Sequence, residues 1–120
     1  MKILICESDE ILLTAIEFRL SKQGFNVVLS KMKNSIKSEL AAVDPDLVIV
    51  DMDMKKPAGM EVVKEVKGWR GDHTSVLLLA DPDDEEGILE AFNMGISDFI
   101  SKPFKPAELL IRVRRILGAG

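Results

Sequence analysis

The sequence has a single cysteine, no excess of basic residues and no long apolar run, and each of these absences excludes a class of protein. Cys6 alone cannot form a disulfide within the chain, and its place in an apolar run predicts a buried, reduced thiol. A transmembrane helix needs about 18 or more consecutive apolar residues, so we expect no membrane span. Residues 1–6 are too short and too quickly charged for a signal peptide, so we expect a cytoplasmic protein.

The charge balance argues against direct binding of nucleic acid. The chain has 16 Lys and Arg against 20 Asp and Glu, which gives a formal net charge of −4. A nucleic acid partner is usually matched by a basic excess. With 120 residues, 47% of them hydrophobic, the chain suits one globular domain over residues 1–120, in which 118–120 could begin a linker.

Short apolar runs alternate with amphipathic stretches, a pattern typical of βαβ units in a parallel sheet that helices cover on both faces. We expect five strands, at 3–6, 25–29, 47–50, 76–79 and 98–101. We expect helices at 9–23, near 35–42, at 60–69, from 83 or 84 to about 94, and from 106 onward. In the first helix, an apolar stripe at helical spacing begins at Ile11 and includes Ile16 and Leu20. The predicted fold class is therefore α/β, with a doubly wound, five-stranded parallel sheet.

Acidic residues follow three of the predicted strands. Glu7 follows the first strand, Asp51 and Asp53 the third, and Asp81 the fourth. In open α/β sheets the carboxyl ends of the strands are where ligands and chemistry collect, so Asp51 is a candidate nucleophile or metal ligand. Crowded carboxylates raise one another's pKa unless a cation or a donor offsets them. The group therefore implies a bound hard cation, a protonated carboxyl, or a counter-charge from Lys102 at the end of the fifth strand.

A simpler interpretation remains open for part of this acidic group. Asp9, Asp81, Asp83 and Asp84 are also well placed as helix caps and turn residues. Nothing in the sequence pairs an activated nucleophile with a base, so we do not expect an enzyme, although a metal-dependent hydrolase stays as a minor alternative.

Three segments, in register over essentially the whole chain, resemble the receiver domain of bacterial two-component response regulators. They are KILICESDE at 2–10, PDLVIVD at 45–51 with Gly59 in the following loop, and GISDFISKPF at 95–104. The last carries the Lys-Pro-Phe signature of the family, usually with a cis bond before the proline. The resemblance implies a flavodoxin-like receiver architecture.

The resemblance also implies a function and a set of site residues. Asp51 would accept a phosphoryl group from a histidine kinase or phosphotransfer protein, which would make the chain a phosphoprotein. Lys102 and Mg²⁺ would balance charge on the transferring oxygens. The metal ligands implied are Glu7, Asp51 and Asp53, as a weakened site.

Several positions depart from the pattern of the family. Ser8 replaces the acid that usually binds the metal, and Ala80 replaces the Thr or Ser that bonds the phosphoryl group. Asp81 stands where a small residue is usual, and Phe99 fills the aromatic switch position without a hydroxyl. These departures leave a second hypothesis open, an atypical pseudo-receiver that acts as a phosphorylation-independent protein-interaction module.

The last third of the chain implies a surface for partners. In the family, the face built from the fourth helix, the fifth strand and the fifth helix pairs subunits or contacts an output domain. Asp98 and Arg112 could pair across the two-fold axis of a homodimer. The alternative is an ordinary solvated helix face, since exposed ion pairs are worth about 0–1 kcal/mol.

Overall fold

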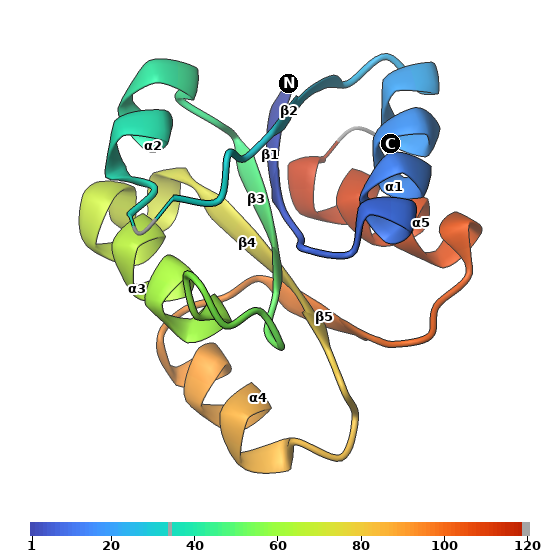
Figure 1. Cartoon of the computed structure of the whole chain (residues 1–120). Helices are drawn as coiled ribbons and strands as arrows, with labels where there is room; N and C mark the ends of the chain where they lie inside the picture. The colour runs from blue at the N-terminus through green and yellow to red at the C-terminus, as the bar shows by residue number, and fades with distance from the viewer. Residues whose placement is uncertain (34, 119–120) are drawn as a thin grey trace.

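A five-stranded parallel sheet forms the centre of the computed structural model, which describes residues 1–33 and 35–118 (Figure 1). The strands are β1 (Lys2–Cys6), β2 (Asn26–Leu29), β3 (Leu47–Asp51), β4 (Ser75–Ala80) and β5 (Asp98–Ser101), in the order β2-β1-β3-β4-β5. The helices are α1 (Glu10–Lys22), α2 (Lys37–Val43), α3 (Gly59–Arg70), α4 (Glu85–Asn93) and α5 (Pro106–Leu117), with a 3-10 turn, η1, at Gly71–His73. This arrangement confirms the predicted fold class. Within the described residues, no helix is long and apolar enough to cross a membrane.

The helices cover the sheet in two layers. Helices α1 and α5 lie on one face, and α2, α3 and α4 lie on the other (Figure 1). Successive residues of a strand point to opposite faces, so Val48 and Val50 pack under the second layer while Leu47 and Ile49 pack under the first. Burial on both faces explains why the central strands are continuous apolar runs and not alternating ones.

The helix boundaries follow the capping signals in the sequence. Asp9 caps α1, because its Oδ1 accepts hydrogen bonds from the backbone N–H groups of Ile11 and Leu12 at 3.0 and 3.2 Å. Asp84 caps α4 in the same way, through the N–H of Gly87. Helix α2 begins two residues later than predicted, at Lys37, and no side chain caps it. Gly118 ends α5 in the left-handed conformation, and residues 119–120 of the predicted linker lie outside the described part.

The predicted apolar stripe of α1 is partly wrong. Ile16 and Leu20 are buried as expected, but Ile11 is 85% exposed. Ile11 lies in the first turn of the helix, two residues after the cap residue Asp9, so helical spacing alone does not bury it. Cys6, in contrast, is a free and fully buried thiol as predicted, and burial raises its pKa to about 12.

Candidate functional site

Asp51 is the last residue of β3, and its carboxylate is the centre of the site. Its side chain is only 7% exposed. Both oxygens accept hydrogen bonds from the Lys102 ammonium, at 2.9 Å for Oδ1 and 3.0 Å for Oδ2. The backbone N–H of Asp53 also donates to Oδ1, at 2.9 Å. A buried carboxylate is thus held in one orientation by a charged donor and a backbone donor.

Lys102 reaches this carboxylate from the next strand but one. It follows β5 directly, and its backbone N–H donates to the carbonyl of Ala80 at 2.9 Å, which fixes the chain beside β4. Its Nζ also lies 3.0 Å from Oδ2 of Asp53, so one ammonium bridges two carboxylates. The bond from Lys102 to Pro103 is cis, as the Lys-Pro-Phe signature led us to expect.

Glu7 lies directly after β1 and is also buried, with 2% of its surface exposed. Its Oε1 accepts a hydrogen bond from the N–H of Asp9 at 2.9 Å, whereas the buried Oε2 has no hydrogen-bond partner among the described residues. Burial raises the pKa of Glu7 to about 7, and the neighbouring Asp51 carboxyl adds to this effect. Two buried carboxyl groups this close together are costly to ionise at the same time, so Glu7 holds its proton more tightly than an exposed glutamate does.

The other two groups stay charged. Burial opposes the ionisation of Asp51, but the neighbouring Glu7 carboxyl and the hydrogen bonds from Lys102 outweigh it and hold the pKa of Asp51 below its ordinary value. Burial likewise opposes the charge on Lys102, and its hydrogen bonds to Asp51 and Asp53 outweigh burial and raise the pKa of Lys102. The site is therefore the ion pair of Asp51 and Lys102 beside the Glu7 carboxyl, which gains or loses its proton near neutral pH.

A close approach of α3 to the end of β3 positions the loop after Asp51. A Cβ on Gly59 would lie 2.6 Å from the backbone oxygen of Asp51 and 2.7 Å from Cα of Met52. Only glycine fits there without a shift of the backbone. In the loop between β3 and α3, Lys55 and Ala58 form an isolated antiparallel bridge, and the peptide bond before Pro57 is cis.

The positions that depart from the expected pattern surround this site. Ser8 is exposed, and Ala80 is fully buried at the end of β4. Asp81 is exposed and turned into its own loop, where its Oδ1 accepts from the N–H of Asp83 at 2.9 Å, as the turn-residue interpretation predicted. Phe99 is half-buried and meets the ring of Phe92 edge-on, with centroids 6.0 Å apart.

The three predicted metal ligands are only partly gathered. Glu7 and Asp51 lie together at the edge of the sheet, whereas Asp53 is half-exposed and engaged by Lys102. Over residues 1–33 and 35–118, no group of three or more potential ligands is arranged to hold a metal ion.

Comparison with known proteins identifies this arrangement. A family model described as the response regulator receiver domain matches residues 3–114. This chain is a response-regulator receiver domain. The match extends from β1 into α5, so it covers the strands that carry Glu7, Asp51 and Lys102.

Among the relatives of this receiver, the alkaline phosphatase synthesis transcriptional regulatory protein PhoP of Bacillus subtilis is 27% identical over 116 residues. The match covers 97% of this chain but 48% of PhoP, so the receiver spans about half the length of that regulator. The BeF3-activated receiver domain of RstA from Klebsiella pneumoniae is 32% identical, with 98% of each chain covered and a TM-score of 0.83. A CheY-like receiver from Methanospirillum hungatei, at 19% identity, shares the fold over 98% of this chain and 94% of its own, with a TM-score of 0.89.

Two features of the receiver were not anticipated from its sequence. Arg112 and Asp98, predicted as partners across a dimer axis, form an ion pair of 2.7 Å within the chain. Met52, which follows Asp51, packs against Gly87 of α4. A Cβ on Gly87 would lie 2.3 Å from Cε of Met52. A glycine in the first turn of a predicted helix was the only signal for this contact.

Proposed function

We propose that this receiver is a phosphoryl acceptor in two-component signalling and that Asp51 is the residue modified. The observation that supports the proposal is the state of Asp51, which is buried, ionised and paired through both oxygens with Lys102. Phosphoryl transfer needs mainly positioning and electrostatic stabilisation, and both are present without a separate base. The donor would be a histidine kinase or a phosphotransfer protein, and the family favours a cytoplasmic location for this receiver.

In the proposed reaction, an Asp51 oxygen forms a bond to phosphorus while the bond from phosphorus to the donor's imidazole nitrogen breaks. The imidazole keeps the electron pair and takes up a proton from solvent. The N–H of Asp53 orients the attacking carboxylate, and Lys102, whose ammonium already bridges Asp51 and Asp53, would neutralise charge on the transferring oxygens. Ala80 is buried at the end of β4 and has only a methyl group, so no hydroxyl at that position can hold the phosphorylated product.

The residues at this edge of the sheet fit a Mg²⁺ ion. The buried Oε2 of Glu7 has no hydrogen-bond partner among the described residues, and the Glu7 carboxyl is a close neighbour of the Asp51 carboxyl. Mg²⁺ usually takes one or two carboxylates and completes its shell with water and phosphate oxygens. Glu7 and Asp51 would hold it, with Asp53 as a weaker third ligand, and the bound ion would supply further charge neutralisation during transfer.

Intact-mass measurement after incubation with acetyl phosphate and Mg²⁺ tests the proposal. Wild type should gain the mass of a phosphoryl group, and Asp51→Asn should gain none. Asp83→Asn, an exposed acid in a neighbouring loop, is the matched control and should label like wild type. No adduct on wild type, while another receiver labels in the same tube, would exclude Asp51 as an acceptor for this donor.

The second candidate function is a pseudo-receiver that binds partners without phosphorylation. It is favoured by the buried methyl group of Ala80, because the usual hydroxyl is missing where the phosphoryl group would be held. The triple variant Ser8→Asp, Ala80→Thr, Asp81→Ala separates the two functions. If the departures alone prevent labelling, the variant gains an Asp51-dependent adduct that wild type lacks.

We further propose that the receiver controls an output domain or a second copy through the face of α4, β5 and α5. PhoP, of which this chain matches about half, is by name a transcriptional regulatory protein. Helices α4 and α5 carry three exposed apolar side chains, namely Leu89, Phe92 and Ile111 at 63, 40 and 58%. An apolar centre with a charged rim is the common composition of a protein interface.

A further inference from the structure

Met52 lies between the phosphoryl site and helix α4, and no part of the function proposed above uses it. Its two neighbours in the chain, Asp51 and Asp53, both bond the Lys102 ammonium, at 2.9 and 3.0 Å. The N–H of Asp53 also donates to Oδ1 of Asp51 at 2.9 Å, so the two neighbours are bonded to each other as well. A change in the bonding of the Asp51 carboxylate therefore acts on the chain on both sides of Met52.

The backbone of Met52 is packed between β4 and α3. Its N–H donates to the carbonyl of Leu79 at 2.9 Å. A Cβ on Gly59 would lie 2.7 Å from Cα of Met52 and 2.9 Å from its carbonyl oxygen, so the start of α3 rests directly on this residue. Close-packed interiors transmit strain to the groups in contact, because there is no void to absorb it. A rearrangement at residues 51–53 is therefore passed to whatever the Met52 side chain touches.

The Met52 side chain touches the first turn of α4. A Cβ on Gly87 would collide with Cε of Met52 and would lie 2.6 Å from Oδ2 of Asp84. The same Asp84 caps α4, because its Oδ1 accepts from the N–H of Gly87 at 3.1 Å. Glycine at position 87 thus lets the thioether methyl reach the turn where α4 is capped. Within the described chain, only Gly59 and Gly87 have atoms closer than 3.0 Å to the place of a Cβ, and atoms of Met52 are among them in both cases.

Helix α4 is held at both ends by the residues that would report on the site. Met52 contacts its first turn, and Phe92 near its last turn meets the ring of Phe99 from β5 edge-on, with centroids 6.0 Å apart. Leu89 lies between these two contacts and is 63% exposed. A shift of the first turn against Met52 therefore changes how Leu89 is presented on the surface.

A hydrogen-bonded link through the end of β4 is not available to this chain. Ala80 occupies that position, fully buried, and its methyl group can neither donate to nor accept from a phosphoryl oxygen. The packing of Met52 against Gly87 is a connection of a different kind, because it needs no hydroxyl.

We propose that Met52 is a positioning residue that transmits the state of Asp51 to helix α4 through its contact with Gly87. The proposal takes its input from the proposed phosphorylation of Asp51 and states how that event reaches the surface. Once an Asp51 oxygen is bonded to phosphorus, its charge is lost, and the bonds that it accepts from Lys102 and from the N–H of Asp53 are rearranged. Met52 moves with this loop, and the capped turn of α4 moves with Met52.

Amide NMR spectroscopy of the ligand-free receiver tests the link from α4 to the site. Gly87→Ala places a methyl group against Cε of Met52 and should shift the amide signal of Asp53. The same substitution made in Met52→Ala meets no thioether, so the shift at Asp53 should fall by about half or more. Contact of the new methyl group with Asp84 is common to both backgrounds and cancels in this cycle.

The reverse direction is tested by adding Mg²⁺ and beryllofluoride, the group named for the activated RstA receiver. In wild type, the amide signals of Asp53 and Leu89 should both shift. Met52→Ala should keep the shift at Asp53 and lose about half or more of the shift at Leu89. Met60→Ala is the matched control and should keep both shifts, because Met60 is also half-buried against the same core cluster.

Three results would overturn the proposed link in variants with wild-type circular dichroism. One is a shift at Asp53 from Gly87→Ala that is the same with and without the Met52 side chain. Another is a shift at Leu89 on loading that Met52→Ala leaves intact, and the third is an equal loss in Met60→Ala. If beryllofluoride shifts no amide of wild type, the proposed phosphorylation fails, and the cycle in the ligand-free protein still decides whether Met52 connects the site to α4.

Discussion

At the scale of single residues, the site is a competition between burial and charge. Glu7 and Asp51 are both nearly inaccessible to solvent, and Lys102 is the one charged side chain of the described residues that bonds either of them. The outcome is uneven, because Lys102 bonds both oxygens of Asp51 while Oε2 of Glu7 is left without a partner among the described residues. Asp51 therefore keeps its charge and Glu7 bears the cost of burial.

This imbalance predicts a pH-dependent gain in stability on removing the Glu7 charge. The pKa of Glu7 rises from 4.5 to about 7 on folding, so the folded state binds the proton more tightly and loses stability as pH rises through that window. The pKa of Asp51 is lowered, so its contribution is lost only as pH falls below its ordinary value of 3.8. Glu7→Gln should thus stabilise the metal-free protein by about 1–2 kcal/mol at pH 8 and have little effect at pH 5.

Urea unfolding in EDTA at the two pH values measures this difference. The control is Glu90→Gln, an exposed acid of α4, which should shift both midpoints equally. If the gain from Glu7→Gln is the same at pH 5 and pH 8, Glu7 is not the group that titrates between them.

At the same scale, the sequence predicted which residues meet but not which hydrogen-bond partners or protonation state each of them has. Asp51 and Lys102 were expected together because both follow strands whose carboxyl ends share one edge of a parallel sheet. The outward turn of Asp81 was one of two open interpretations. In the structure, a hydrogen bond from the N–H of Asp83 holds the Asp81 carboxylate in its own loop. The protonation behaviour of Glu7 depends on distances of a few ångström, which no spacing in the sequence encodes.

At the scale of secondary-structure elements, strands were predicted more reliably than helix starts. The strand at 98–101 matches β5 to the residue, because a short apolar run between turn signals has few alternatives. Helix α2 begins two residues later than predicted, at Lys37. The Ser35 side chain lies outside it, donates its hydroxyl proton to Glu65 of α3 and accepts a hydrogen bond from the N–H of Lys37 at 3.3 Å. Contacts of this kind between helices are not visible in the local sequence pattern.

Helix α3 offers a direct test of what its two glycines do. Gly59→Ala should destabilise the receiver by about 2 kcal/mol or more, because its Cβ would meet the backbone of Asp51 and Met52 and the neighbours cannot yield without moving the site. Gly68→Ala should stabilise it by about 0.5–1 kcal/mol, because the space is open and alanine favours helix. Thermal unfolding of the two variants measures both effects. Loss of stability in Gly68→Ala would mean that a neighbouring group occupies the space over Gly68.

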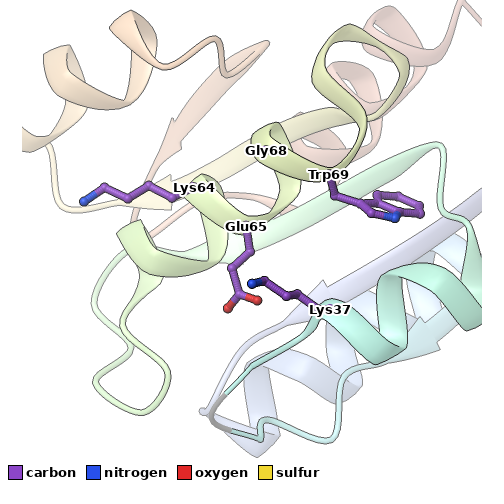
Figure 2. Close-up of a pocket in the computed structure, with 5 residues that line it drawn as sticks. All are labelled: Lys37, Lys64, Glu65, Gly68 and Trp69. Carbon is purple, nitrogen blue, oxygen red and sulfur yellow. The ribbon is translucent and has the colours of Figure 1, made fainter.

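At the scale of the whole molecule, the receiver presents different surfaces on its two sides. Helices α4 and α5 carry exposed apolar side chains, whereas a pocket between α2 and α3 is lined by Lys37, Lys64, Glu65, Gly68 and Trp69 (Figure 2). The ion pair of Asp98 with Arg112 lies at the first of these surfaces and is satisfied within one chain. Dimerisation through it would therefore depend on apolar burial or on exchange of that pair between copies.

The apolar side chains predict how self-association of the receiver should respond to mutation. If the phosphorylated state pairs through α4, β5 and α5, then Mg²⁺ with beryllofluoride, the group named for the activated RstA receiver, should raise the mass measured by light scattering toward that of a dimer. Leu89→Asp would place a charge in the apolar centre and should shift the protein back to the monomer, with a dimerisation constant weakened by about tenfold or more. Phe18→Asp on α1 is the matched control, since Phe18 is 66% exposed against 63% for Leu89. A dimer that Phe18→Asp disrupts and Leu89→Asp leaves intact would move the interface to α1, and the exposed residues of α4 would then need a partner other than a second copy.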